Sequence, residues 1–195
     1  IKYPVEVTLE EAYQGTSRVI SLEVEEACSG CGGSGKIQNV PCSVCRGSGR
    51  VARLKRLEVK IPPGVTDGSR VRIAGKGGPG YGGGKNGDLY LVISVRPHQL
   101  FERKGDDLYV EVAVPLTVAV LGGEVQVPTL KGKLALKIPS ETQNGRVFRL
   151  KGQGMPHLGN SSRGDLLAKV KVILPTKLSP QEKQLFEQLS KLRPN

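Results

Sequence analysis

The chain has few aromatic side chains and no long hydrophobic run. Its 195 residues include no Trp, one Met and only 4% aromatic residues, so no base-stacking platform for nucleic acid is evident. No apolar run approaches the roughly 18 residues that a membrane-spanning helix needs, so no membrane segment is expected. The first residues, Ile1 to Pro4, form neither the basic n-region nor the apolar h-region of a signal peptide. The missing initiator Met indicates an excised fragment.

Histidine is equally scarce, which bears on catalysis. His98 and His157 are the only two, and each follows a proline in a turn-like segment. No nucleophile–base pair of the kind that activates a serine or cysteine can be recognised around them. We therefore expect a protein that is not an enzyme.

Glycine, proline and basic residues are abundant instead. The 26 Gly and 13 Pro favour short strands joined by turns over long helices. The net charge of +11 raises nucleic acid or an acidic partner as a possibility, but does not determine the fold. Acidic residues concentrate in positions 1–27 and basic residues in positions 28–60.

The second half of the chain repeats the first at an offset of 77 residues, from Ile61 to Ile138. The other matching pairs are Lys60/Lys137, Pro62/Pro139, Gly68/Gly145, Arg72/Arg149, Gly75/Gly152, Gly77/Gly154, Pro79/Pro156, Gly82/Gly159, Gly87/Gly164, Asp88/Asp165, Leu89/Leu166 and Val95/Val172. Glycines and prolines dominate, so turn geometry is what repeats most faithfully. We interpret the two copies as one β-unit used twice.

Each copy contains short segments with the alternating pattern of half-buried strands. Strands are predicted at 57–61, 70–73 and 89–95 in the first copy, and at 134–138, 147–150 and 165–174 in the second. A glycine-rich loop is expected at 75–87. Because no helical periodicity separates the strands, we expect antiparallel sandwiches and not a parallel doubly wound sheet.

Two helices are expected, one near each end of the chain. Thr8 and Glu11 form a capping box, and Gly15 ends the first helix. Ser179 and Pro180 begin the second. Its apolar stripe consists of Leu185, Phe186, Leu189 and Leu192. The stripe is expected either to pack on its own domain or to form a dimer contact.

The four cysteines provide the strongest local signal. They form two copies of Cys-x-x-Cys-x-Gly-x-Gly, at Cys28, Cys31, Cys42 and Cys45. Two such pairs supply the four corners of a tetrahedral zinc site, and the glycines permit the tight turns that it requires. Four thiolates leave no open coordination position, so we expect one structural Zn²⁺ per chain.

Other uses of these cysteines remain open at this point. One disulfide within each pair would close small, strained rings, and a thioredoxin-like redox site lacks its βαβ context. Iron–sulfur ligation is possible from four thiols, but the spacing matches neither common ferredoxin run. The nearby basic residues can offset the negative charge of a zinc–thiolate site, or contact phosphate as in a nucleic-acid-binding zinc ribbon; they are Lys36, Arg46, Arg50, Arg53 and Arg56.

Together these motifs resemble the DnaJ family of co-chaperones over nearly the whole chain. The resemblance is carried by the doubled cysteine motif and by the segments 8–15, 61–68, 87–90, 96–108 and 152–156. It implies an all-β fold with short helices, made of two tandem β-sandwich domains. The implied boundaries are 1–104 for the first sandwich with a zinc-binding insertion at 26–51, 105–176 for the second, and 177–195 for a C-terminal helix and possible dimerisation segment.

The resemblance also implies a function. Related proteins bind unfolded client polypeptide as an added strand beside an apolar pocket, prevent its aggregation and deliver it to a DnaK-type heat-shock chaperone. The matching positions are Ile1, Ile20, Leu22, Leu57 and Leu91. Sandwich core is the alternative role for each of them. A homodimer in the full-length protein is implied, as is a location in a bacterial-type cytoplasm or an organelle of bacterial origin.

Two features depart from the family pattern. Zinc-bearing members usually carry four copies of the cysteine motif and two metal ions, whereas this chain has two copies and therefore one metal site. No His-Pro-Asp tripeptide occurs, so this chain alone is not expected to stimulate the ATPase of the partner chaperone. Nucleic acid remains the rival ligand, recognisable by an affinity that falls steeply with salt.

Overall fold

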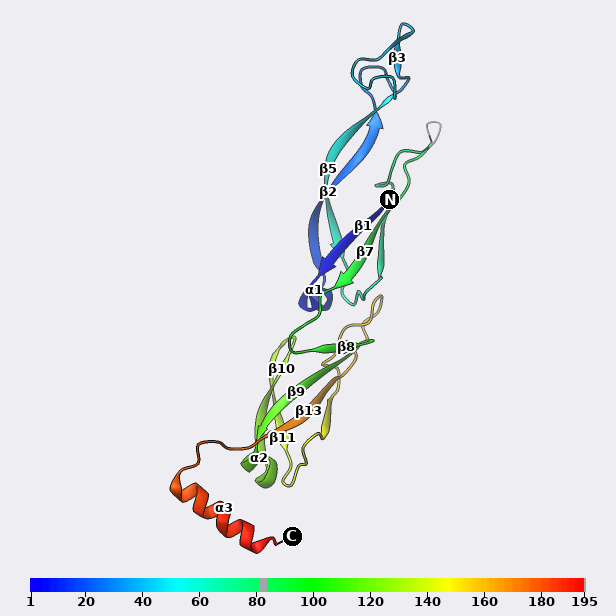
Figure 1. Cartoon of the computed structure of the whole chain (residues 1–195). Helices are drawn as coiled ribbons and strands as arrows, with labels where there is room; N and C mark the ends of the chain where they lie inside the picture. The colour runs from blue at the N-terminus through cyan, green and yellow to red at the C-terminus, as the bar shows by residue number, and fades with distance from the viewer. Residues whose placement is uncertain (81–83, 195) are drawn as a thin grey trace. The chain divides into compact units, whose positions relative to one another are not determined.

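The computed structural model describes residues 1–80 and 84–194. The chain forms two compact units: Ile1–Gln99 with Met155–Arg163 (unit 1), and Leu100–Gly154 with Gly164–Asn195 (unit 2). Strands make up most of the regular structure in both units, accompanied by short helices (Figure 1). The predicted all-β fold with short helices is confirmed.

Unit 1 is a sandwich of two sheets. In the three-stranded sheet, β7 (Leu89–Val95) lies between β1 (Lys2–Val7), which is parallel to it, and β6 (Arg70–Ile73), which is antiparallel. The second sheet pairs β2 (Thr16–Ala27) with β5 (Arg50–Ile61) along their full length. Side chains alternate between core and solvent, as the pleat requires. The largest fully buried side chains of the unit are Ile61, Leu89, Leu91, Ile93, Met155, Val7, Val59 and Val65.

Helix α1 (Leu9–Gln14) connects the two sheets of unit 1 and begins where the sequence predicts. The Thr8 amide donates to Glu11 Oε2 at 2.9 Å, and the Glu11 amide donates to Thr8 Oγ1 at 3.2 Å. Glu11 also receives two hydrogen bonds from Arg18 Nη2, each 2.7 Å long. Gly15 ends the helix at φ +77°, a conformation that glycine adopts without strain.

Unit 2 repeats this architecture. Its larger sheet has the order β12 (Val147–Leu150), β13 (Leu166–Ile173), β9 (Asp107–Pro115) and β8 (Glu102–Lys104). Strands β13 and β9 are parallel, as β1 and β7 are in unit 1, so these sheets are mixed and not purely antiparallel as expected. Its smaller sheet pairs β10 (Gly123–Thr129) with β11 (Gly132–Ile138), and α2 (Leu116–Leu121) connects the two. Helix α2 was not predicted from the sequence, because its β-branched residues are typical of a strand and no side chain caps its start.

The strand registers show that the two units match element by element. Val5 pairs with Ile93 in unit 1 as Val112 pairs with Val170 in unit 2. The hairpin β2–β5 spans residues 16 to 61, whereas its counterpart β10–β11 spans only 123 to 138. The additional length in unit 1 carries the cysteines and the short strands β3 (Lys36–Ile37) and β4 (Val40–Pro41) at the tip of the hairpin (Figure 1).

A repeated Arg–Asp–Gly interaction explains part of the sequence repeat. In unit 1, Asp88 accepts hydrogen bonds from Arg72 Nε at 2.6 Å and from the Gly75 amide at 3.0 Å. In unit 2 the counterpart Asp165 accepts from Arg149 Nη1 at 2.7 Å and from the Gly152 amide at 3.0 Å. The Gly75 amide and then the Arg72 guanidinium hold the pKa of Asp88 below its ordinary value. We call this three-residue interaction the loop staple, because it fixes the loop that follows β6 or β12.

One segment of the second repeat lies in unit 1. Met155 is completely buried there, and Arg163 Nη1 donates to the Tyr13 hydroxyl at 2.6 Å. The Arg163 guanidinium also lies 5.0 Å from the centroid of the Tyr13 ring. The backbone of residues 156–158 runs directly against Gly64. Periodicity alone cannot predict this arrangement, because it assigns residues 155–163 to the second copy.

Helix α3 (Pro180–Leu192) follows unit 2 and has a capping box at Ser179 and Glu182. None of its residues is buried. Its apolar stripe is 36–79% exposed and consists of Leu185, Phe186, Leu189 and Leu192. Packing of the stripe on its own domain, one of the two expectations, is therefore not observed. No described helix combines the length and apolar character needed to cross a membrane.

Candidate metal centre and peptide groove

The four cysteines converge at the tip of the β2–β5 hairpin. All four Sγ atoms lie within 4.8 Å of one another. The Cys28–Cys42 pair is 3.8 Å apart and the Cys31–Cys45 pair is 3.7 Å apart, and all four residues are free thiols. A tetrahedral ion with metal–sulfur bonds of about 2.3 Å requires sulfurs about 3.8 Å apart. The spacing of the sulfurs therefore fits one tetrahedral ion. Because all four thiols are free, the structure has no disulfide within either Cys-x-x-Cys motif.

The two cysteine motifs form nearly identical halves of this site. The Cys28 amide donates to the Gly49 carbonyl and the Cys42 amide to the Gly35 carbonyl, each at 2.9 Å. The Gly35 amide donates to Cys31 Sγ, as the Gly49 amide does to Cys45 Sγ, each at 3.2 Å. Such hydrogen bonds favour the thiolate form, which is the form that binds a metal. Each half thus supplies backbone support to the other.

The thiols differ in how easily they ionise. Burial raises the pKa of Cys28 to about 11. Burial also opposes ionisation of Cys31, but the Gly35 and Gly33 amides and the neighbouring thiols outweigh it and lower the pKa to about 7. A metal that binds all four sulfurs as thiolates must therefore displace protons, so its apparent affinity increases with pH.

The second glycine of each motif lies where no side chain fits. A Cβ on Gly35 would lie 2.5 Å from the Gly47 carbonyl oxygen, and one on Gly49 would collide with the Gly33 carbonyl. Both residues also have positive φ, at +76° and +73°. Each motif therefore requires glycine at this position for two reasons: its backbone has positive φ, and it lies in close contact with the backbone of the other motif.

Gly35→Ala should weaken metal binding by about tenfold or more, because the clash separates the two halves and removes the site's preorganised geometry. Gly32→Ala is the matched control, since Gly32 also has positive φ (+61°) but its Cβ would meet nothing within 4 Å. Competition with a chromophoric chelator measures both affinities. Equal losses in the two variants would show that backbone conformation, and not the contact between halves, is what matters.

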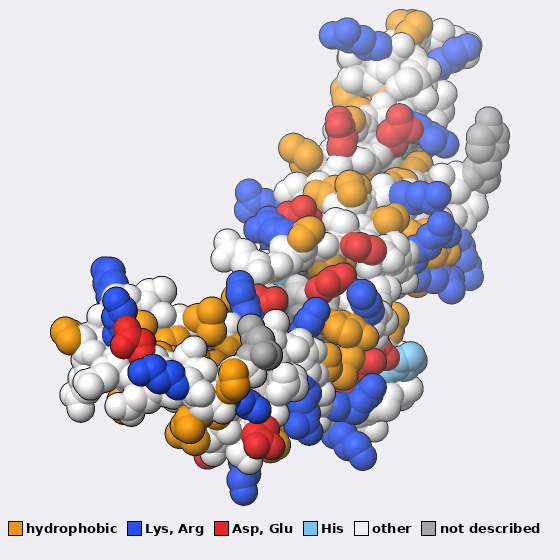
Figure 2. All heavy atoms as spheres, turned by 60° about the horizontal axis from the view of Figure 1, so that its bottom comes forward, with side chains coloured by type: hydrophobic (Ala, Val, Ile, Leu, Met, Phe, Trp, Pro, Cys, Tyr) orange, Lys and Arg blue, Asp and Glu red, His pale blue; other side chains and the backbone are white. Residues whose placement is uncertain are grey.

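Some of the charges beside this site are paired across the hairpin. Arg50 lies 3.4 Å from Glu25 across the hairpin, and Glu26 forms ion pairs with Lys55 and Arg53. The acidic and basic stretches of the sequence are thus brought together by strand pairing. Figure 2 likewise shows acidic side chains dispersed among the basic ones on the visible face. Three of the five basic residues near the cysteines, Lys36, Arg46 and Arg56, form no ion pair within the described residues, so the pairing reduces the positive charge at the cysteines without removing it.

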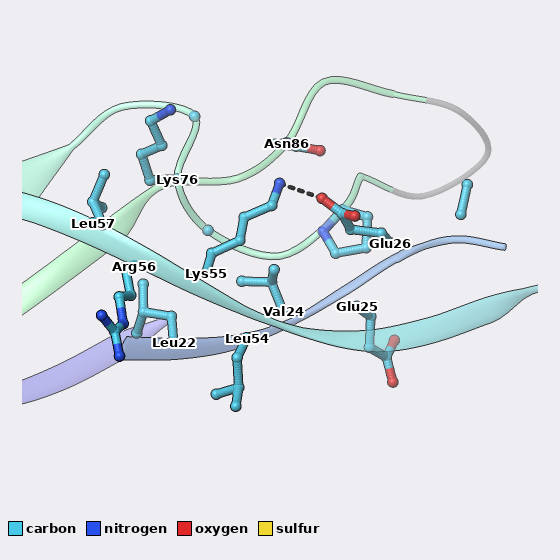
Figure 3. A pocket seen from close by; sticks show the side chains of 14 residues that line it. Leu22, Val24, Glu25, Glu26, Leu54, Lys55, Arg56, Leu57, Lys76 and Asn86 are labelled. Atoms are coloured by element: carbon cyan, nitrogen blue, oxygen red, sulfur yellow. Dashed lines mark ion pairs between the residues drawn. The ribbon is translucent and has the colours of Figure 1, made fainter. Parts of the chain in front are cut away.

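A groove lies between the inner face of the β2–β5 hairpin and the loop that follows β6. We call it the unit 1 groove; it has a volume of about 800 Å³. Its apolar lining includes Leu22, Val24, Leu57 and Pro79. Lys55 reaches across the groove toward Glu26, while Lys76 lies near Leu57 at the other end (Figure 3).

The expected client-binding residues occupy different positions. Leu22 and Leu57 line the unit 1 groove. Ile20 and Leu91 are 5% and 0% exposed and contribute to the sandwich core. Ile1 is 51% exposed, and its amino group donates to the Asp88 carbonyl at 3.0 Å. The structure thus brings two of the five into the groove, and leaves two in the core and one at the surface.

Sequence reasoning did not identify several residues that line the groove. Val24 could have been included, since it follows Ile20 and Leu22 at a spacing of two on the same strand face. Lys76 and Pro79 come from a loop about 50 residues away from β2 in the chain, and no local pattern indicates that they face β2.

Of the two histidines, His98 has its Nε2 atom 2.8 Å from Glu10 Oε1, in an ion-pair arrangement.

Comparison with known proteins agrees with this geometry. The family model for the DnaJ C terminal domain matches residues 1–175. The chain is similar to proteins named Chaperone protein DnaJ from Opitutus terrae (41% identity over 98% of this chain and 60% of that protein) and Brevibacillus choshinensis (49%, 90% and 46%). A third, from Brucella canis, is 39% identical over 98% of this chain and 62% of that protein.

The chain spans about half to three fifths of the length of these relatives. The family match nevertheless covers unit 1 with its cysteine-bearing hairpin and groove, and the sandwich of unit 2, and it ends before α3. The chain belongs to the DnaJ family of chaperone proteins, and corresponds to its C-terminal domain.

Proposed function

We propose that the chain binds extended segments of unfolded polypeptide in the unit 1 groove, prevents their aggregation and delivers them to a DnaK-type heat-shock chaperone. The observation that carries this proposal is a groove open to solvent whose lining includes the apolar side chains of Leu22, Val24 and Leu57. In the described residues, β2 and β5 pair only with each other, so each keeps a free edge. An extended peptide can add to such an edge by backbone hydrogen bonds while one side chain enters the groove.

The metal in this proposal is one structural Zn²⁺ held by the four cysteines. Thiolate ligands, tetrahedral spacing and four buried or half-buried sulfurs support zinc over harder cations, which prefer oxygen. A multi-iron cluster would need the sulfurs farther apart. The ion would fix the tip of the hairpin, and no step of peptide binding depends on it.

The remaining proposals concern partners and location. The exposed stripe of α3 supports a homodimer in the full-length protein, since an uncovered apolar helix face favours association. The bacterial relatives support a cytoplasmic location. Nucleic acid is the second candidate ligand, favoured by the net charge of +11 and by the basic residues that flank the cysteines.

Leu57→Ser should weaken binding of an apolar peptide by about tenfold to a hundredfold, because burying one aliphatic side chain contributes about 1.5–3 kcal/mol. Fluorescence anisotropy with a labelled apolar peptide measures the affinity, and suppression of aggregation of a denatured client provides a second readout. Leu22→Ser should also weaken peptide binding. Because Leu22 is only 6% exposed, this variant should in addition lower the stability of unit 1.

Val19→Ser is the matched control, since Val19 lies on β2 at 68% exposure and does not line the groove. Metal content should be unchanged in all three variants. Full holdase activity in Leu57→Ser and Leu22→Ser would reject the groove as the client site. Salt-sensitive binding of DNA or RNA in place of peptide would favour the second candidate.

A further inference from the structure

The two ends of the unit 1 groove differ in their charge. At the end nearer the cysteines, Glu25 and Glu26 line the groove, and both are already paired with Arg50, Arg53 and Lys55. At the other end, Lys76 lies near Leu57 (Figure 3). Within residues 1–80 and 84–194, no carboxylate forms an ion pair with Lys76. Arg56 also lines the groove and forms no ion pair in the described residues, but it lies on the other side of β5 from Lys76 (Figure 3). Lys76 is therefore the unpaired positive charge that lies beside Leu57 on the inner side of the hairpin.

The backbone around Lys76 is firmly held. On one side, the Gly75 amide donates to Asp88 within the loop staple. On the other side, the Gly77 amide donates to the Gly87 carbonyl at 2.8 Å, and the Gly87 amide donates to the Gly78 carbonyl at 2.9 Å. A fixed backbone lowers the conformational entropy that Lys76 would lose on binding an anion. Asp88 itself is occupied by Arg72 and Gly75, so it does not neutralise Lys76.

The internal repeat shows that the fold does not require a cation at this position. The counterpart of Lys76 in unit 2 is Gln153, one residue after Gly152. The loop staple there has the same partners and nearly the same distances, with Arg149 at 2.7 Å and Gly152 at 3.0 Å from Asp165. Since a neutral side chain serves equally well in the same loop, the charge of Lys76 is available for a ligand.

We propose that the unit 1 groove selects client segments in which an aliphatic residue is flanked by Asp or Glu, and that Lys76 is the specificity-determining residue. This inference rests on the proposed peptide-binding function of the groove. The aliphatic side chain contacts Leu22, Val24 and Leu57, and a flanking carboxylate reaches the Lys76 ammonium. A basic flank is disfavoured, because it would place like charges together at the same end.

The test uses three labelled peptides with one shared aliphatic centre and acidic, neutral amide or basic flanks. Fluorescence anisotropy on the intact chain should give an acidic-over-neutral preference of about threefold to tenfold at low salt. The preference should shrink toward one at about 0.5 M salt, where the Debye length falls to a few ångströms. An unchanged ratio across that salt range would contradict an electrostatic origin.

Lys76→Gln copies the residue of unit 2, and should remove most of the acidic-over-neutral preference, measured as the ratio of the two affinities. Lys76→Glu should reverse it in favour of the basic peptide. Lys133→Glu is the control for net charge, because Lys133 is an exposed residue of β11 outside the groove; it should keep the preference. Thermal unfolding of each variant should match that of the parent chain, since Lys76 is exposed.

Leu57→Ser separates failure of this inference from failure of the proposed function. If it weakens all three peptides while Lys76→Gln leaves the acidic preference intact, the groove binds client but Lys76 does not select it. If Leu57→Ser leaves all three affinities unchanged, the groove is not the peptide site and both proposals are wrong. Loss of every peptide in Leu57→Ser together with loss of preference in Lys76→Gln supports both.

Discussion

Removing the metal should unfold residues 28–49 and leave both β-sandwich units folded. The only buried apolar residues in this segment are Cys28, Cys42 and Cys45. The aliphatic side chains there are exposed, at 47% for Ile37, 63% for Val40 and 60% for Val44. The segment thus has no hydrophobic core apart from its cysteines, and a structural zinc ion contributes about 10 kcal/mol or more to the folding of zinc sites of this size.

Elemental analysis should find one metal ion per chain before chelation and none after it. Amide hydrogen exchange should then become fast in residues 28–49 and stay slow in β7 and β13, whose strands are central in their sheets. Cys28→Ser should reproduce the effect of the chelator, and Ser29→Ala should not. Continued protection of residues 28–49 without metal would contradict the assignment, as would global unfolding.

Gly64→Ala should lower the free energy of unfolding of unit 1 by about 2–5 kcal/mol. Gly64 has φ +91°, and an added Cβ would lie 2.6 Å from the Leu158 amide nitrogen and 2.8 Å from the Pro156 carbonyl oxygen. Both neighbours are backbone atoms, so they cannot move aside as a flexible side chain would. The left-handed conformation costs about 1–2 kcal/mol for a residue with a Cβ, and the overpacking adds about 1–3 kcal/mol.

Gly68→Ala isolates the first of these two costs. Gly68 has φ +79°, and its Cβ would meet nothing within 4 Å. This variant should therefore lower the free energy of unfolding of unit 1 by only about 1–2 kcal/mol, as measured by urea unfolding. Similar losses in the two variants would mean that residues 156–158 do not pack against Gly64 in solution.

Much of the fold could be predicted from local sequence patterns. The capping box at Thr8 and Glu11 and the strands at 70–73, 89–95 and 147–150 lie where the sequence predicts them. One half of the repeat was missed. Residues 5–15 recur at an offset of 107, not 77. The structure shows this recurrence, because β1 pairs with β7 in unit 1 as β9 pairs with β13 in unit 2. The shared residues are Val5/Val112, Val7/Val114, Leu9/Leu116, Ala12/Ala119 and Gly15/Gly122.

The candidate site was only partly predictable. The spacing of the cysteines determines that four thiols can meet, because the glycine-rich turns are local. The groove is different, since Leu22, Leu57 and Lys76 come from three separate segments. Which side chain faces a groove depends on how the sheets pack, and the alternation that identifies Ile20 and Leu91 as inward-facing cannot separate core from groove.

The sequence by itself determined which four thiols meet, the β architecture and the membership of the chain in its family, because these depend on short-range spacing and on turns that only glycine and proline allow. Only the tertiary structure decided where residues 155–163 pack, which acidic and basic residues neutralise each other, and which cation remains beside the groove. Each of these is a contact between segments far apart in the chain, and its energy depends on a distance that composition and periodicity do not contain.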